Sequence, residues 1–117
     1  VFVYGSLRRG MAQHHLITCA PFLGYSSTAD TFTLYDSGDW PAAVPTGVTA
    51  IYGELYELSP QELVAIDAYE RHPDFFCRQR VMLADGQITS IWIYILEIPG
   101  HWKRIGTGDW VRYTEDT

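Results

Sequence analysis

A glycine turn near the start of the chain is the first feature of this sequence that could carry chemistry. Tyr4-Gly5-Ser6-Leu7 directly follows the apolar segment Val1-Phe2-Val3. Gly5 has no Cβ, so it can adopt a positive φ and let the backbone come close to a ligand. Successive N–H groups in such a turn form an anion-binding nest, and we expect a carboxylate there. The alternative is that Gly5 serves only the turn from strand to loop.

A carboxylate on a capped helix is the second feature. Ser59-Pro60-Gln61-Glu62 has the capping-box spacing, with proline at the first helical position, and this pattern predicts a helix start. At about 100° per residue, one arc of this helix holds the side chains of Leu63, Ile66, Asp67 and Glu70. Glu70 therefore shares the apolar face and lies near the helix C-terminus.

Three influences are expected to raise the pKa of the Glu70 carboxyl. They are burial on the apolar face, the negative end of the helix dipole and the neighbouring charge of Asp67. A glutamate with a raised pKa can exchange protons near neutral pH, which makes Glu70 a candidate acid–base catalyst. Two alternatives stay open: Glu70 pairs with Arg78 or Arg80 on the next strand, or it lies in solvent beyond a frayed helix end.

Composition narrows the class of protein. At 117 residues, the chain is expected to form one domain over residues 1–117. Its net charge of −6 and single lysine offer no basic patch for nucleic acid. Cys19 and Cys77 form no CxxC pattern, so we expect buried, reduced thiols and no zinc site. No apolar run approaches the ~20 residues of a membrane-spanning helix, and the N-terminus begins in a strand, so we expect a cytoplasmic protein.

Other catalytic arrangements find little support in the sequence. Ser6 has no histidine pattern or nucleophile elbow that would make it part of a catalytic triad. The adjacent His14 and His15 point to different sides of a helix, which suits a metal poorly. Lys103 is the only lysine, and its charged neighbours suggest exposure. Arg8-Arg9 is expected to be solvated surface, with anion steering as the alternative.

Strand-like segments dominate the secondary structure that we expect. The pattern predicts a short helix at residues 11–18 and strands at 22–28, 31–35 and 48–58. Asp85-Gly86 predicts a type I′ turn between strands 75–84 and 87–97. Residues 88–96 are apolar on both faces, which is typical of a central, covered strand. Gly53 interrupts its strand and favours a curved sheet or barrel.

Residues 37–47 contain two prolines and two glycines, so we expect an irregular loop there. It either contributes to function or connects strands of a barrel with Trp40 as its anchor.

The chain resembles the gamma-glutamylcyclotransferase-like family, in particular its small bacterial YtfP-like branch. Five segments carry the resemblance, in order along nearly the whole chain: Phe2-Val3-Tyr4-Gly5-Ser6-Leu7-Arg8-Arg9-Gly10, Gly38-Asp39-Trp40-Pro41-Ala42-Ala43-Val44, Gly53-Glu54-Leu55-Tyr56, Ile66-Asp67-Ala68-Tyr69-Glu70 and Phe75-Phe76-Cys77-Arg78. Two departures are Ile66, where leucine is usual, and Phe76, where tyrosine is frequent. The second departure removes a hydroxyl that could line the pocket.

The resemblance implies an α+β fold, with a partly closed barrel of about six strands flanked by helices. It implies that Tyr4, Gly5, Ser6 and Leu7 hold a gamma-glutamyl group and that Glu70 is the catalytic acid–base. Arg78 is expected to assist substrate binding. The reaction implied is release of 5-oxoproline from a small gamma-glutamyl amine or peptide, without metal or cofactor.

Two other functions remain open at this point. One is a binding module that retains the pocket for a small anionic metabolite, and a buried ion pair between Glu70 and Arg78 would favour it. The other is a structural subunit that uses aromatic surface for protein contacts. The sequence does not identify the leaving amine. We expect residues 37–47 to form the part of the pocket that recognises it.

Overall fold

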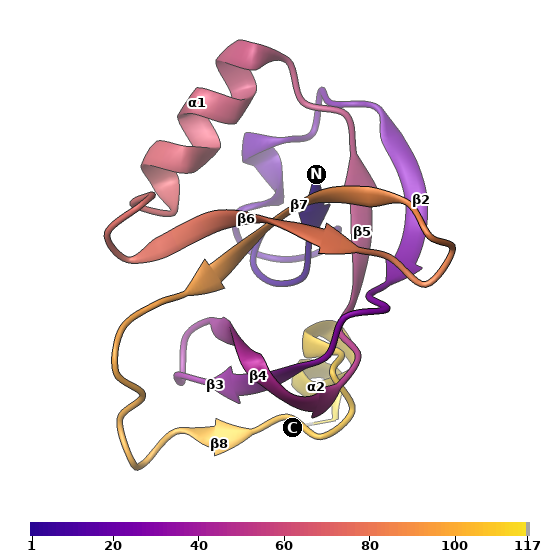
Figure 1. Cartoon of the computed structure of the whole chain (residues 1–117). Helices are drawn as coiled ribbons and strands as arrows, with labels where there is room; N and C mark the ends of the chain where they lie inside the picture. The colour runs from indigo at the N-terminus through magenta and orange to yellow at the C-terminus, as the bar shows by residue number, and fades with distance from the viewer. Residues whose placement is uncertain (117) are drawn as a thin grey trace.

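The computed structural model describes residues 1–116 as a mixed α+β fold (Figure 1). Its elements, in chain order, are β1 (Phe2–Val3), the 3₁₀ helix η1 (His14–Leu16), β2 (Phe22–Ser27), β3 (Phe32–Asp36), β4 (Pro41–Thr49), β5 (Tyr52–Tyr56), α1 (Pro60–Tyr69), β6 (Phe76–Met82), β7 (Ile88–Tyr94), β8 (Lys103–Arg104) and α2 (Trp110–Glu115). The α+β class expected from the sequence is confirmed.

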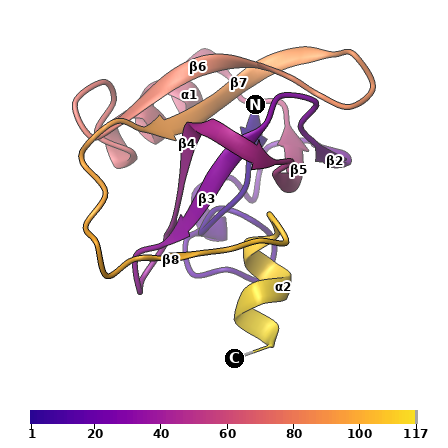
Figure 2. The same cartoon turned by 60° about the horizontal axis from the view of Figure 1, so that its bottom comes forward.

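Three antiparallel sheets organise these strands. Their orders are β1-β5-β2, β4-β3-β8 and β6-β7. Strand β7 packs against both β1 and β4, and therefore joins the two three-stranded sheets. Figure 2 shows the β6–β7 hairpin along one side of the molecule and α2 on the opposite side. No sheet within residues 1–116 closes on itself, so the closed part of the expected barrel is not observed.

The β6–β7 hairpin forms where the sequence predicts it, but with a different turn. Its register runs from Phe76 opposite Tyr94 to Met82 opposite Ile88. The Gly86 N–H donates to the Leu83 carbonyl, so the centre of the turn lies one residue earlier than expected. Gly86 has a φ of 87°, whereas the preceding Asp85 does not have a positive φ. The type I′ assignment is therefore wrong, and the glycine instead ends a longer hairpin loop.

The expected irregular loop at 37–47 is wrong in its second half, because β4 begins at Pro41. Residues 41–44 pair in register with β3, and the register then shifts between Phe32 and Thr33. Proline is tolerated here because β4 lies at the edge of its sheet and Pro41 is the first residue of the strand. Residues 45–48 are exposed and take up the register shift.

The long strand expected at 48–58 is also divided in two. Strand β4 ends at Thr49 and β5 runs from Tyr52 to Tyr56. Gly53 marks the close approach that its position suggested: a Cβ there would collide with the Val3 carbonyl oxygen and lie 2.8 Å from Cζ of Phe2. The glycine thus lets β5 pack directly on β1.

Helix α1 has the start that the sequence predicts. The Ser59 side chain accepts from the Glu62 N–H at 3.1 Å, and the Glu62 carboxylate accepts from the Ser59 N–H at 2.9 Å. The helix expected at 11–18 is wrong, because only η1 forms there. Residues 5–20 instead make mostly hydrogen bonds of the i to i−3 type. Helix α2, which the sequence analysis did not predict, is capped by Asp109.

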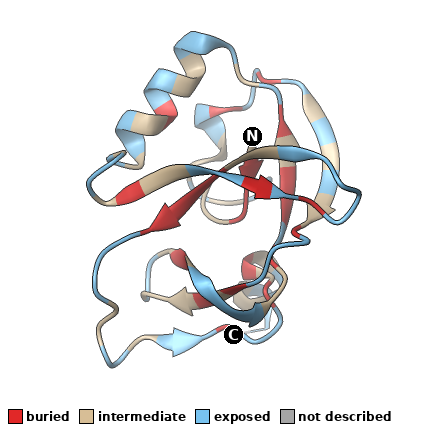
Figure 3. Ribbon diagram, in the orientation of Figure 1, coloured by how far each residue is buried: buried red, intermediate tan, exposed pale blue. Residues whose placement is uncertain are grey.

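Buried residues concentrate in the central strands (Figure 3). In β7, Ile91 to Tyr94 are all buried, so this strand is covered on both faces as expected, although within residues 1–116 it pairs with β6 alone. Ile66 is the buried residue of α1. Cys19 is exposed, which corrects the expectation of two buried thiols. Within residues 1–116, no helix has the length and apolar character needed to span a membrane.

Candidate active site

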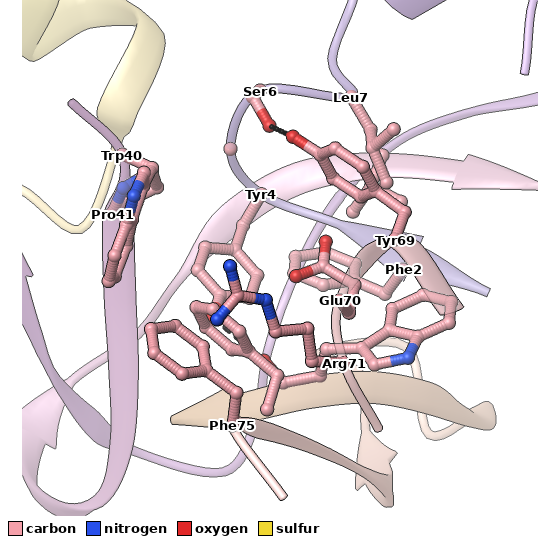
Figure 4. A pocket seen from close by; sticks show the side chains of 14 residues that line it. Phe2, Tyr4, Ser6, Leu7, Trp40, Pro41, Tyr69, Glu70, Arg71 and Phe75 are labelled. Carbon is pink, nitrogen blue, oxygen red and sulfur yellow. Dashed lines mark hydrogen bonds between the residues drawn. The ribbon is translucent and has the colours of Figure 1, made fainter. Parts of the chain in front are cut away.

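The glycine turn and the helical carboxylate meet at one cavity of about 250 Å³ (Figure 4). Tyr4 to Leu7 line it from the loop after β1, and Glu70 lines it from the end of α1. Trp40 and Pro41 contribute from the start of β4. Two segments that lie more than 60 residues apart in the sequence therefore share one pocket, as the acid–base hypothesis requires.

Gly5 is needed for close packing, not for an unusual backbone conformation. A Cβ at this position would lie 2.7 Å from Cγ and 2.9 Å from Cδ of Pro41. Gly5 is not among the glycines with positive φ, so that part of the expectation is wrong. The proline ring holds the loop in place, because it cannot move without displacing β4.

We expect Gly5→Ala to lower stability, because the added methyl group must push Pro41 and the loop apart. Overpacking of this kind costs about 1–3 kcal/mol in the free energy of unfolding. Urea denaturation would measure this effect. Gly100→Ala is the matched control, since a Cβ there meets no atom within 4 Å. An unchanged unfolding midpoint for Gly5→Ala would contradict the packing role.

The backbone of this loop leaves donors free at the cavity. Within residues 1–116, no acceptor is found for the N–H groups of Gly5, Ser6 and Leu7. Two carbonyls of the loop are engaged: Gly5 accepts from the Arg8 N–H at 3.0 Å, and Ser6 accepts from the Gln13 N–H at 2.9 Å. Unpaired N–H groups beside a cavity can bind a carboxylate or a developing oxyanion.

The side chains of the loop hold its position. The buried Tyr4 hydroxyl donates to the Trp92 carbonyl at 2.7 Å and accepts from the Ala43 N–H at 3.2 Å. Burial raises the pKa of Tyr4, so the phenol stays neutral and its proton is already in use. Ser6 Oγ shares a hydrogen bond of 3.0 Å with the Tyr69 hydroxyl, which ties the loop to the end of α1 (Figure 4). Leu7 is buried beneath the turn.

Glu70 is the C-cap residue of α1, and Figure 4 shows its carboxylate in the pocket between Tyr4 and Tyr69. Burial raises the pKa of Glu70 from 4.5 to about 7. Within the described part of the chain, no hydrogen bond or ion pair to this carboxylate is found. The direction of the expected shift is confirmed, and burial is its cause.

Asp67 has a different task from the one expected. It accepts from Arg78 Nε at 3.0 Å, from Arg78 Nη2 at 3.2 Å and from Trp92 Nε1 at 2.9 Å. Burial acts to raise the pKa of Asp67, but these hydrogen bonds and the Arg78 charge outweigh it, and the pKa is lowered. Asp67 therefore stays ionised and fixes α1 to the β6–β7 hairpin.

The position of Arg78 tests the alternative in which Glu70 forms an ion pair with Arg78. Because its guanidinium is bound to Asp67, the alternative in which Glu70 pairs with Arg78 is wrong. Arg78 is also not among the residues that line the cavity, so the structure does not bring it to the place where we expected it to assist substrate binding.

A network of buried charges follows the Gly5 turn, and the sequence patterns did not predict it. Arg8, expected in solvent, is only 6% exposed, and its Nε donates to Glu54 Oε2 at 2.8 Å. Arg8 Nη1 also donates to Asp109 at 2.9 Å. The remaining oxygen of Glu54 accepts from the Arg9 N–H at 3.0 Å and from the Tyr56 hydroxyl at 2.7 Å. A charge inside the apolar strand β5 was the sequence signal that could have revealed this network.

Aromatic rings form one wall of the cavity. The Trp40 ring lies 5.6 Å from the rings of both Phe75 and Phe76, and all three residues line the pocket. Trp40 thus packs against neighbouring aromatic rings and also lines the cavity. Phe76 presents no hydroxyl, so the cavity wall at this point is apolar.

The remaining polar candidates lie outside this pocket. His14 Nδ1 forms a hydrogen bond of 2.8 Å with the Leu7 carbonyl, which supports the loop. His15 and Lys103 are exposed. Within residues 1–116, no three His, Cys, Asp or Glu side chains gather in a way that could hold a metal ion.

Comparison with known proteins identifies the family of the chain. Residues 1–112 match the family described as "Gamma-glutamyl cyclotransferase, AIG2-like". The chain is 36% identical over 112 residues to the gamma-glutamylcyclotransferase family protein YtfP of Escherichia coli K12, covering 95% of each chain. The chain belongs to the gamma-glutamylcyclotransferase family, and the resemblance seen in the sequence is confirmed.

Solved structures agree in fold. An uncharacterised protein from Pyrococcus horikoshii, PH0828, superposes with a TM-score of 0.83 at 27% identity, over 99% of this chain and 92% of that one. An AIG2-like protein from Mus musculus superposes with a TM-score of 0.71 at 25% identity, over 87% of this chain and 80% of that one.

Proposed function

We propose that this protein is a gamma-glutamylcyclotransferase that releases 5-oxoproline from a small gamma-glutamyl amine or peptide. The observation that carries the proposal is the Glu70 carboxyl, which lies unpaired in the cavity with a pKa of about 7. A carboxyl of this kind can accept and return a proton at neutral pH. The family names of the relatives point to the same reaction class.

The substrate supplies its own nucleophile. Its α-amine attacks the γ-carbonyl carbon and closes a five-membered lactam, while the bond from that carbon to the leaving nitrogen breaks. Glu70 takes a proton from the α-ammonium and delivers one to the departing amine, so the proton count balances. The protein has to hold the substrate in a folded conformation, and intramolecular proximity of this kind can supply about 7–11 kcal/mol.

The loop after β1 would position the substrate for this step. The free N–H groups of Gly5, Ser6 and Leu7 offer donors for the α-carboxylate or for the oxyanion that develops on the γ-carbonyl. The aromatic wall at Trp40 and Phe75 would exclude water from the reacting atoms. No residue outside the cavity is needed for the proton transfers.

The rival function is a binding module that keeps the pocket without catalysis. Its signature in the sequence analysis was a buried ion pair between Glu70 and Arg78. The pairing of Arg78 with Asp67 removes that support and leaves Glu70 available for proton transfer. The absence of a metal requirement and the cytoplasmic location remain predictions from the sequence.

We expect purified, chelator-treated protein to form 5-oxoproline from at least one member of a panel of gamma-glutamyl compounds. The value of kcat/KM should rise with pH and level off with an apparent pKa near 7, because Glu70 must be ionised to accept the first proton. Mass spectrometry of 5-oxoproline between pH 5.5 and 8.5 measures both results. Binding of the panel without any product would favour the binding module, and a flat profile across this range would contradict the role of Glu70.

A further inference from the structure

Arg78 stands directly outside the wall of the cavity. It is paired in the β6–β7 register with Trp92, which lines the cavity. Phe76, two residues before Arg78 and on the same face of β6, lines the cavity as well. The Phe76 N–H donates to the Glu70 carbonyl at 3.2 Å, so β6 begins beside Glu70. A cation is therefore held next to the pocket that contains the unpaired carboxylate.

Asp67 and Glu70 are neighbouring carboxylates on one face of α1. Glu70 keeps helical backbone angles at the C-cap, and side chains three residues apart on a helix lie about 5–6 Å from each other at Cβ. Arg78 Nε donates to Asp67 Oδ1 at 3.0 Å, and Arg78 Nη2 donates to Asp67 Oδ2 at 3.2 Å. A displacement of the guanidinium by one such spacing would exchange Asp67 for Glu70 as its partner.

Further hydrogen bonds hold Asp67 and Arg78 in register with each other. Trp92 Nε1 donates to Asp67 Oδ1 at 2.9 Å, and the Arg78 N–H donates to His72 Nδ1 at 2.9 Å. The His72 N–H donates in turn to the Asp67 carbonyl at 2.8 Å. The carboxylate and the guanidinium are thus positioned together by α1, by the turn that follows it and by both strands of the hairpin.

Pairing with Arg78 would change the proton affinity of Glu70. A cation within about 4–6 Å stabilises an ionised carboxylate and lowers its pKa by about 1–3. Burial instead raises the pKa of Glu70 to about 7, and within residues 1–116 no ion pair to this carboxylate is found. The raised pKa therefore depends on Glu70 staying unpaired while an arginine lies beside its pocket.

We propose that Asp67 is a positioning residue that holds the Arg78 guanidinium away from Glu70, so that the Glu70 carboxylate meets the substrate without a bound cation. This inference rests on the proposed function and deepens it, because it names the residue that maintains the proton affinity of the same site. Asp67 acts through Arg78 and does not touch the reacting atoms.

Asp67→Asn removes the charge that holds Arg78 and keeps an oxygen acceptor for Trp92 Nε1. We expect the guanidinium to pair with Glu70, so that the pKa of Glu70 falls by about 1–3 from the wild-type value. Carbon-13 NMR titration of labelled glutamate carboxyls, with the Glu70 signal assigned from Glu70→Gln, measures this change. The midpoint of kcat/KM against pH should move to lower pH by the same amount.

A second variant separates this role from general support of the fold. If Asp67 only supported α1, Asp67→Asn would loosen the helix and let water reach Glu70, which would also lower the pKa. Asp67→Asn combined with Arg78→Gln loosens the same contact but leaves no guanidinium at that position to bind Glu70. We expect this double variant to regain a Glu70 pKa close to that of the wild type. A low pKa in both variants, or an unchanged pKa in Asp67→Asn, would overturn the inference.

Two substitutions serve as controls. Asp85→Asn is matched in charge, because Asp85 is exposed between β6 and β7 and does not line the cavity. Asp67→Glu is the conservative variant and keeps a carboxylate for Arg78. Both should keep the wild-type pKa of Glu70.

Other titratable groups around Glu70 are the same in every variant, so they cannot produce differences between variants. They come from the loop after β1, from α1 and from the turn after α1, and they are Tyr4, Tyr69, Arg71 and His72.

The NMR titration separates this inference from the proposed function, because it needs no turnover. The expected pKa changes without any 5-oxoproline from the wild type would support the role of Asp67 and contradict the cyclotransferase. Turnover by the wild type with an unchanged Glu70 pKa in Asp67→Asn would support the cyclotransferase and contradict the role of Asp67. Circular dichroism checks that each variant is folded, and Asp67→Ser is a second substitution of the same carboxylate. Failure of both Asp67→Asn and Asp67→Ser to fold would assign Asp67 to the fold itself and overturn the inference.

Discussion

Replacing Glu70 by glutamine should reduce turnover about 10²- to 10⁴-fold, the usual contribution of a positioned acid–base group. Glutamine keeps the shape of the side chain but cannot take the proton from the α-ammonium or return one to the leaving nitrogen. Substrate binding should change little, because the loop N–H groups of Gly5 to Leu7 are retained. Production of 5-oxoproline over a range of substrate concentrations gives kcat and KM separately. Equal turnover by the variant and the wild type would keep the reaction and remove Glu70 from its mechanism.

The same substitution should make the protein more stable above pH 7. Burial raises the pKa of Glu70 in the folded protein from 4.5 to about 7, so the folded state binds more protons than the unfolded state between these values. Wild-type stability therefore falls as the pH rises through this window and stays lower above it. Each pKa unit corresponds to about 1.4 kcal/mol, so the gain at pH 8 has an upper limit of about 3 kcal/mol.

Urea denaturation at pH 4 and pH 8 would measure this effect. At pH 4 Glu70 is mostly protonated in both states, so the variant and the wild type should differ little. Glu97→Gln, which changes an exposed glutamate outside the cavity, is the control for loss of one negative charge. A loss of stability for Glu70→Gln at pH 8 would show that the carboxylate has a favourable partner, and would contradict its assignment as an unpaired, desolvated group.

Glu54→Ala should cost about 3–5 kcal/mol in the free energy of unfolding, because it leaves the buried Arg8 without its closest partner. The Arg9 N–H and the Tyr56 hydroxyl lose their acceptor at the same time. Since residues 8 and 9 directly follow the Tyr4–Leu7 loop that lines the cavity, the proposed activity should fall together with stability.

The midpoint of urea denaturation, with turnover measured below the unfolding transition, would test this prediction. Glu57→Ala is the matched control, because Glu57 is exposed and surface substitutions usually change stability by less than about 0.5 kcal/mol. A midpoint for Glu54→Ala equal to that of the wild type would show that the network contributes little to the fold.

The elements that the sequence predicted well depend on residues close together in the chain. The start of α1 needs only Ser59, Glu62 and the proline between them. The β6–β7 hairpin needs two apolar segments and a glycine turn, and even here the turn type differed because only Gly86 adopts a positive φ. Helix periodicity also placed Glu70 on the buried face of α1, which is sufficient to explain its raised pKa.

The features that the sequence did not predict depend on which distant segments of the chain come into contact. Strand β4 was missed because its two prolines argue against a strand, and only its place at a sheet edge makes them acceptable. The choice of Asp67 over Glu70 as the partner of Arg78 depends on how α1 lies against β6. No local pattern distinguishes these outcomes, because the competing interactions have similar strength until the packing fixes their distances.

The sequence by itself thus determined the family, the capped helix, the hairpin and the two segments that meet at the cavity, since each has a pattern of local residue types. Only the tertiary structure decided how these segments are held together. Arg8 and Glu54 lie 46 residues apart, and nothing in either segment requires that they meet. Likewise, the turn at Gly5 depends on Pro41, and the cavity exists only where β1, β4 and the end of α1 converge. Burial and partner choice are properties of that packing, and they set the charge state of the carboxylates on which the proposed chemistry depends.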